Sequence, residues 1–130
     1  MLGSVRPCNL LKTEVVDDEE TVREVTKDML EELGFNVITA KDGREGVALF
    51  HRYSQELSIV LLDMLMPVMD GATALPLMVE VDRSIPIILM SGYSEQEATE
   101  PFSGKGPAEF IKKPYDQRQL ISKIRGVLDS

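Results

Sequence analysis

Five polar side chains stand where short apolar runs of the sequence end, and their types suit the handling of a phosphoryl group. They are Asp17, Asp18, Asp63, Ser91 and Lys113. Carboxylates within a few ångströms of one another repel, and at least one pKa rises unless a cation lies between them. Mg²⁺ meets that need, since it binds few carboxylates and keeps positions for water or phosphate oxygens. With a hydroxyl and an ammonium beside it, such a site is suited to phosphoryl transfer onto Asp63.

Each of these signals is weak alone, and their shared position at the ends of different strands carries the interpretation. An acidic pair is more often a solvated loop, and a strand-end serine or a Lys-Pro pair more often forms a turn. Lys112 competes with Lys113 as the functional amine. Because side chains alternate along a strand, the two point to opposite sides, and the lysine beside Pro114 is the better candidate.

Alternating apolar runs and helical patterns predict the elements that bring these side chains together. Strand-like runs end at residue 16 and cover 35–40, 58–62, 85–90 and, more weakly, 108–111. Helical patterns occupy 22–33, 42–50, 70–78, 94–100 and 116–128, of which the third is interrupted by Pro76 and the fourth is cut short by Pro101. Five strands alternating with five helical segments predict an α/β fold with a doubly wound parallel sheet. In such sheets, ligands bind beyond the carboxyl ends of the strands.

Composition excludes several classes of protein. The 130 residues are 43% hydrophobic and 28% charged, which is typical of one globular domain, and the net charge is −8. That charge opposes binding to nucleic acid or to an anionic membrane surface. The single cysteine, Cys8, cannot form an internal disulfide, and no apolar run approaches the roughly 20 residues of a membrane helix. We therefore expect a cytoplasmic protein.

Four stretches of the sequence resemble the motifs of response regulator receiver domains from two-component systems. They are Val-Val-Asp-Asp-Glu at 15–19, Val-Leu-Leu-Asp-Met-Leu-Met-Pro-Val-Met-Asp-Gly at 60–71, Met-Ser-Gly-Tyr-Ser at 90–94 and Phe-Ile-Lys-Lys-Pro at 110–114. The likeness extends from Val15 to Leu128, and the 90–94 stretch is most similar to receivers of hybrid sensor histidine kinases.

The resemblance implies a fold and a role. The fold is flavodoxin-like, with five strands in the order 2-1-3-4-5 and five flanking helices. The role is that of a phosphoacceptor module in a phosphorelay rather than an enzyme, in which Asp63 receives a phosphoryl group from a histidine kinase or a phosphotransfer domain. The donor could be the kinase portion of a longer hybrid protein.

The resemblance also implies ligands for Mg²⁺. Asp18 and Asp63 would bind the ion together with the backbone carbonyl of Leu65, and Asp17 would act through a bound water. Ser91 and Phe110 occupy the two switch positions of the family, and Lys113 occupies the position of its active-site lysine.

Two departures from the family pattern bear on these expectations. Leu65 is apolar where many relatives carry a polar side chain. Lys12, Thr13 and Glu14 stand where receivers show an aliphatic run, and a glutamate buried without a partner in a central strand would cost several kcal/mol. We therefore expect regular pairing to begin near Glu14, or Glu14 to face solvent or a cation. The domain is assigned to 13–130, with 1–12 as an extension.

Two alternative functions share the acidic residues. A Mg²⁺-dependent phosphohydrolase could use Asp63 as nucleophile, but haloacid-dehalogenase-type phosphatases need a second aspartate two residues on, where this chain has Leu65. A pseudo-receiver that binds partners without phosphorylation would be expected to lack one of the acidic pair, Asp63 or Lys113, and all of them are present.

Overall fold

A single parallel sheet forms the centre of the molecule. The computed structural model describes residues 11–94, 96–97 and 107–129. The five strands are β1 (Lys12–Val16), β2 (Asn36–Ala40), β3 (Leu57–Asp63), β4 (Ile87–Ser91) and β5 (Glu109–Lys112). They lie in the order β2-β1-β3-β4-β5 with every neighbouring pair parallel. The predicted fold and strand order are confirmed.

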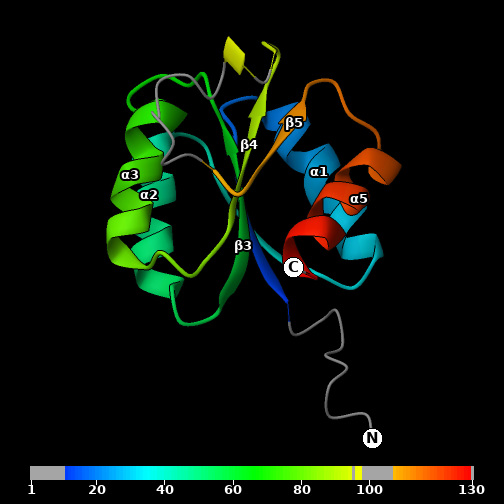
Figure 1. Ribbon diagram of the computed structural model, residues 1–130, viewed down its shortest axis with the longest axis horizontal. Helices are drawn as coiled ribbons and strands as arrows, with labels where there is room; N and C mark the ends of the chain where they lie inside the picture. Colours follow the sequence, from blue (N-terminus) through cyan, green and yellow to red (C-terminus); the bar gives the residue numbers. More distant parts are fainter. Residues whose placement is uncertain (1–10, 95, 98–106, 130) are drawn as a thin grey trace, which may run out of the picture.

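Helices cover both faces of the sheet (Figure 1). The helices are α1 (Glu20–Glu32), α2 (Gly43–Tyr53), α3 (Gly71–Val81) and α5 (Gln117–Leu128). α2 and α3 lie on one face, and α1 and α5 lie on the other. The helical segment expected at 94–100 falls mostly outside the described residues. None of the helices in the described part of the chain is long and apolar enough to cross a membrane.

Local sequence signals explain where most helices begin and end. Asp42 and Asp70 cap α2 and α3, each accepting a hydrogen bond from the backbone N–H three residues on. Gly34 follows α1 with a φ of 92°, a left-handed conformation that glycine adopts without strain. Pro76 was expected to interrupt α3, and that expectation is wrong. The helix runs through it to Val81, because Leu75 and Met78 on the buried face anchor the turns on either side.

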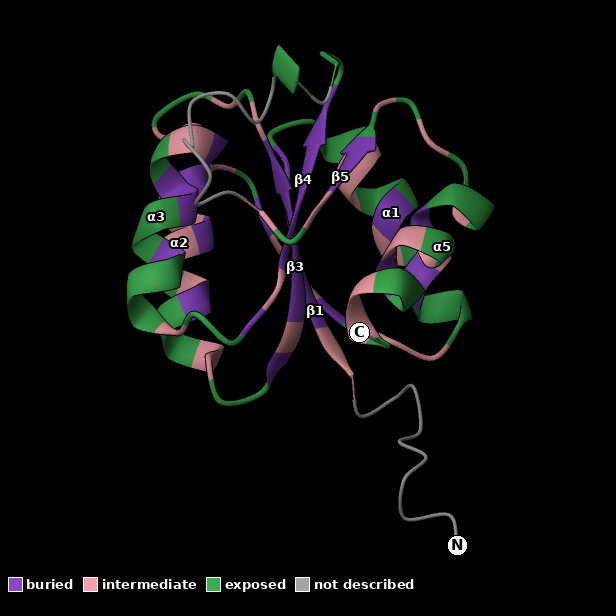
Figure 2. Cartoon of the chain, in the orientation of Figure 1, coloured by how far each residue is buried: buried purple, intermediate pink, exposed green. Residues whose placement is uncertain are grey.

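Two apolar cores hold the layers together, and the strands contribute to both (Figure 2). On one side, Val16, Val60 and Leu62 pack with residues of α2 and α3. On the other, Val15 and Leu61 pack with residues of α1 and α5. Because the strands are buried on both faces, polar side chains are driven to their ends. The carboxyl ends of the strands therefore form the polar edge on which the sequence analysis placed the site.

The start of β1 departs from the expectation. Pairing begins at Lys12, with a register shift against β3 between Lys12 and Thr13. Glu14 lies within β1, is 0% exposed, and neither carboxyl oxygen has a hydrogen-bond partner within the described part of the chain. The prediction that Glu14 would face solvent or a cation is therefore wrong. β1 lies between β2 and β3, and backbone pairing with both strands fixes it in the sheet whatever side chain it carries.

Burial keeps Glu14 uncharged. Loss of hydration raises the pKa of its carboxyl from 4.5 to about 9, and the negative charge of Glu45 contributes in the same direction. At neutral pH, Glu14 is thus protonated when the protein is folded and ionised when it is unfolded. The free energy of unfolding falls as pH rises from about 4.5 to about 9, by at most roughly 1.4 kcal/mol per pH unit.

Replacing Glu14 by Val is expected to stabilise the protein, because an apolar side chain removes the desolvation of a carboxyl group. The unfolding midpoint at pH 8 should rise by roughly 5 °C or more. The gain should shrink toward pH 4, below the ordinary pKa of 4.5, where most of the wild-type glutamate is protonated in both states. Thermal unfolding of wild type, Glu14→Val and the exposed-site control Glu32→Gln at both pH values measures this. A clear loss of stability in Glu14→Val would mean that the glutamate has a specific partner.

Candidate functional site

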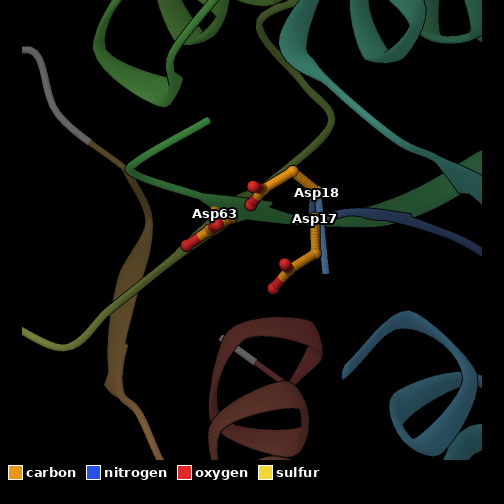
Figure 3. A group of neighbouring side chains, drawn as sticks. All are labelled: Asp17, Asp18 and Asp63. Carbon is orange, nitrogen blue, oxygen red and sulfur yellow. The ribbon is translucent and has the colours of Figure 1, made fainter. Parts of the chain in front are cut away.

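Three carboxylates meet at the polar edge of the sheet (Figure 3). Asp17 and Asp18 follow β1, and Asp63 is the last residue of the neighbouring strand β3. One carboxylate oxygen from each of the three side chains lies within 4.8 Å of the other two. Asp17 and Asp63 are buried, whereas Asp18 is exposed. The structure therefore brings together the three acidic residues that the sequence analysis selected.

Backbone contacts hold the acidic residues in place. The Glu19 backbone N–H donates to Asp17 Oδ1 over 2.9 Å, and Arg23 of α1 donates to the Asp17 carbonyl oxygen over 2.8 Å. On the β3 side, α3 begins directly against the end of the strand that carries Asp63. A Cβ at Gly71 would lie 2.5 Å from the carbonyl oxygen of Asp63, so glycine is required for this close approach.

Lys113 crosses the edge of the sheet to reach the carboxylates. Its Nζ lies 2.8 Å from Asp17 Oδ2 and 3.2 Å from Asp63 Oδ1, and Glu19 Oε1 is 3.8 Å away. The Lys113 backbone N–H donates to the Ser91 carbonyl over 2.7 Å, which ties its position to β4. Lys112 is exposed. The ammonium at the site therefore belongs to Lys113.

Burial and neighbouring charges set the pKa of the Asp63 carboxyl. Burial raises the pKa of Asp63 from 3.8 to about 7, Asp17 adds to the rise, and the charge and hydrogen bond of Lys113 oppose it. For Lys113, burial alone would lower the pKa, but the hydrogen bond to Asp17 and the charge of Asp63 outweigh that effect and raise it. The ammonium therefore stays charged, and it holds Asp63 closer to ionisation than burial alone would.

The other predicted site residues lie on β4, on β5 and in the loop after β3. Ser91 ends β4, is buried, and its Oγ accepts a hydrogen bond from the Tyr93 N–H over 3.0 Å. Phe110 of β5 is 6% exposed and packs in the core on the α2–α3 side, so its ring lies inward. Leu65 is 56% exposed in the loop after β3. Whether its carbonyl binds a cation stays a prediction.

Sequence reasoning missed several residues that support the site. Glu19 and Arg23 fix the turn after β1, and Tyr115 hydrogen-bonds Thr26 of α1 beside Lys113. One signal was available for Arg23, since a cation near a helix N-terminus opposes the helix dipole and so indicates a specific partner. The Tyr115–Thr26 pair spans 89 positions in the sequence, and periodicity offered no signal for it.

The donor set suits a hard divalent cation. Three carboxylates converge while Lys113 supplies one positive charge, so negative charge remains in excess. All three donors are oxygens, the ligands that Mg²⁺ prefers, and exposed Asp18 leaves the group open on the solvent side. The residues present therefore fit Mg²⁺.

Comparison with known proteins identifies the family. Residues 14–125 match the response regulator receiver domain. The chain belongs to this family. Receiver domains are two-component signalling modules that typically bind Mg²⁺ at an acidic site.

Individual relatives differ in length. The receiver is 32% identical to the chemotaxis protein CheY of Treponema pallidum, over 88% of this chain and 80% of CheY. It is 34% identical to the Vibrio cholerae autoinducer sensor kinase/phosphatase CqsS, over 85% of this chain but only 16% of CqsS. It is 31% identical to the probable transcriptional regulator ycf27 of Guillardia theta, over 90% of this chain and 45% of that protein. The chain thus spans less than half the length of that regulator.

Solved structures agree in fold. The crystal structure of the CheX–CheY complex of Borrelia burgdorferi with BeF₃ and Mg²⁺ matches with a TM-score of 0.85 and 30% identity, over 90% of this chain and 88% of the matched one. A receiver domain protein from Clostridium thermocellum matches with a TM-score of 0.85 and 27% identity, over 92% and 95% of the two chains.

Replacing Lys113 by Met is expected to raise the pKa of Asp63 above its value of about 7 in the metal-free protein, because Lys113 opposes the rise. Carbon NMR titration of the aspartate carboxyls without metal measures it. Lys112→Met removes an identical charge from the exposed neighbour and should leave the Asp63 titration in place. Equal shifts in the two variants would contradict a specific contact between Lys113 and Asp63.

Proposed function

We propose that this receiver domain accepts a phosphoryl group on Asp63 from a phosphohistidine, in a step that depends on Mg²⁺. The observation that carries the proposal is the bridging position of Lys113, whose ammonium lies within 3.2 Å of both Asp17 and Asp63. A charge placed there serves the oxygens of a phosphoryl group arriving at Asp63.

The transfer exchanges one bond to phosphorus for another. A carboxylate oxygen of Asp63 attacks the phosphorus in line with the phosphohistidine nitrogen, the new P–O bond forms, and the P–N bond breaks, leaving its electron pair on the imidazole. Asp63 must be ionised to attack, and Lys113 favours that state. Lys113 and the Ser91 hydroxyl then hold phosphoryl oxygens.

Mg²⁺ bound at the site would offset the negative charge that gathers as donor and acceptor meet. We propose that Asp18 and Asp63 bind it directly, with the backbone carbonyl of Leu65, and that Asp17 acts through a bound water. The convergence of the three carboxylates supports this assignment. Mg²⁺ also accompanies BeF₃ in the Borrelia burgdorferi complex.

A switch follows from the same contacts. The Ser91 hydroxyl now accepts a hydrogen bond from the Tyr93 N–H. A phosphoryl group on Asp63 would compete for this hydroxyl, and Phe110, already buried, would occupy the space beneath it. Amide resonances of Ser91 and Phe110 that stay unchanged on phosphorylation would contradict this coupling.

The relatives indicate the kind of partner. The similarity to a segment of the sensor kinase CqsS supports a receiver that works with a histidine kinase or phosphotransfer domain, including the kinase portion of a longer hybrid protein. We place this exchange in the cytoplasm.

A phosphohydrolase remains the alternative from another class, and the residues present oppose it. No carboxylate stands two residues after Asp63, where Leu65 is exposed and apolar. Steady turnover of a phosphate ester would favour the hydrolase, whereas stoichiometric labelling favours the receiver.

Incubation with acetyl phosphate and Mg²⁺ is expected to add one phosphoryl mass to the wild type. EDTA should prevent the addition, because the carboxylates would then repel the donor. Asp63→Asn should remain unlabelled, while Asp129→Asn, which removes an exposed carboxylate at the C-terminal end of α5, should label normally. Intact-mass measurement follows each reaction, and equal labelling of Asp63→Asn would refute the assignment of the acceptor.

The phosphorylated state is expected to be long-lived, because the apolar side chain of Leu65 cannot orient an attacking water and would cover its approach to phosphorus. Leu65→Asn should accelerate phosphate loss by about tenfold, the effect of one orienting hydrogen bond. Val68→Asn introduces the same side chain at another exposed position of the loop and should leave the rate unchanged. Phosphate release after donor removal measures both, and an unchanged or slower rate in Leu65→Asn would refute water exclusion.

A further inference from the structure

A partly buried polar contact joins α1 to the loop that carries Lys113. The hydroxyl of Tyr115 lies 2.7 Å from that of Thr26, within the ordinary range of a hydroxyl–hydroxyl hydrogen bond. Tyr115 also donates toward the Met90 sulfur over 3.3 Å, and Thr26 is 1% exposed. We propose that Tyr115, through its bond to Thr26, is a positioning residue that sets the Lys113 ammonium between Asp17 and Asp63. This inference rests on the proposed function.

Lys113 needs such support because of its chemistry. Its charge sits at the end of a flexible four-carbon stem, so the reach of the ammonium depends on where the backbone holds the base of that stem. The backbone N–H of Lys113 is tied to the Ser91 carbonyl, but Pro114 follows and has no N–H to donate. Tyr115 is the next residue, and its hydroxyl supplies the contact that fixes the loop from the other side.

The partners of Tyr115 belong to the elements that hold the carboxylates. Thr26 lies on α1, which begins directly after the acidic turn and also anchors that turn through Arg23. Met90 is the register partner of Asp63 in the β3–β4 ladder, and its carbonyl accepts the N–H of Met64. One hydroxyl therefore ties the Lys113 loop to both α1 and β4. The distance from Lys113 to its two carboxylates is set through these contacts.

Packing alone does not account for the hydroxyl. A phenylalanine would fill the same apolar space against α1, while a tyrosine must satisfy its hydroxyl when buried. Burial raises the pKa of Tyr115, so the hydroxyl remains protonated and can donate at neutral pH. Apolar packing fixes the tyrosine ring only loosely, whereas a hydrogen bond to Thr26 also fixes its orientation. A fixed ring holds the loop, and with it the base of the Lys113 side chain, in one position.

Removing either partner should impair phosphorylation without removing a group that touches the donor. In Tyr115→Phe and in Thr26→Val, labelling of Asp63 by acetyl phosphate with Mg²⁺ should slow by about 3- to 10-fold, the effect of one hydrogen bond. Thr26→Ser keeps the hydroxyl and should label at the wild-type rate. Tyr53→Phe makes the same change on α2, far from Lys113, and serves as the control.

A second measurement separates positioning from a loss of stability. The side-chain carbon and nitrogen resonances of Lys113 should move in Tyr115→Phe and Thr26→Val but not in Thr26→Ser, while those of Lys112 stay in place. Wild-type labelling rates in Tyr115→Phe, or slower labelling with unmoved Lys113 resonances, would overturn the inference. Failure of the proposed function would look different, since wild type would then be unlabelled or Asp63→Asn labelled.

Discussion

The ion pairs of Lys113 with Asp17 and Asp63 join parts of the fold that would otherwise repel one another. Asp63 ends β3 and Asp17 follows β1, so the parallel sheet brings two buried carboxylates to one edge. Lys113 follows β5, on the far side of β4, and its long stem spans that strand to reach both. A shorter cationic side chain at this position would not cross the same distance. The site thus depends on a contact between opposite halves of the sheet.

The same parallel sheet explains why ionisable side chains gather at its carboxyl edge. It also explains the state of Glu14, which lies elsewhere. Strands covered on both faces leave little room for charge along their length, so ionisable side chains collect at strand ends. Glu14 is the exception, because it lies inside β1 with its carboxyl unpaired within the described residues. The Glu14 carboxyl remains protonated in the folded protein. Its burial lowers the free energy of unfolding and leaves the charges of the site unchanged. Apolar clusters on both faces of the sheet offset this loss of stability.

Much of the site was predictable from sequence because its residues directly follow apolar runs, and these runs mark the buried strands. Asp63 and Ser91 could be placed because each directly follows an apolar run. A parallel sheet then brings the carboxyl ends of those runs to the same edge. The burial of the Glu14 side chain could not be predicted in this way. Its local preference favours exposure, whereas pairing with β2 and β3 buries it, and that pairing is not local. Pro76 misled for a related reason, since packing of α3 outweighs the loss of one backbone hydrogen bond. The bond between Thr26 and Tyr115 joins residues with no shared pattern, so only the folded chain shows it.

The charges of the site decide the order in which its ligands can arrive. With Asp17, Asp18 and Asp63 ionised and Lys113 protonated, three negative charges face one positive, which leaves two in excess. A phosphoryl group carries a charge of about −1.5 to −2, and charges about 4 Å apart near a protein surface interact by about 4 kcal/mol. In the proposed transfer, a divalent cation would therefore have to be bound before the donor approaches. A phosphoryl group on Asp63 would make the local charge negative again even with the cation present. The Ser91 hydroxyl, which ends the neighbouring strand β4, is a dipole that could turn toward that excess. In the proposed function, the excess of negative charge that would make transfer depend on a metal is therefore also what would draw the Ser91 hydroxyl inward.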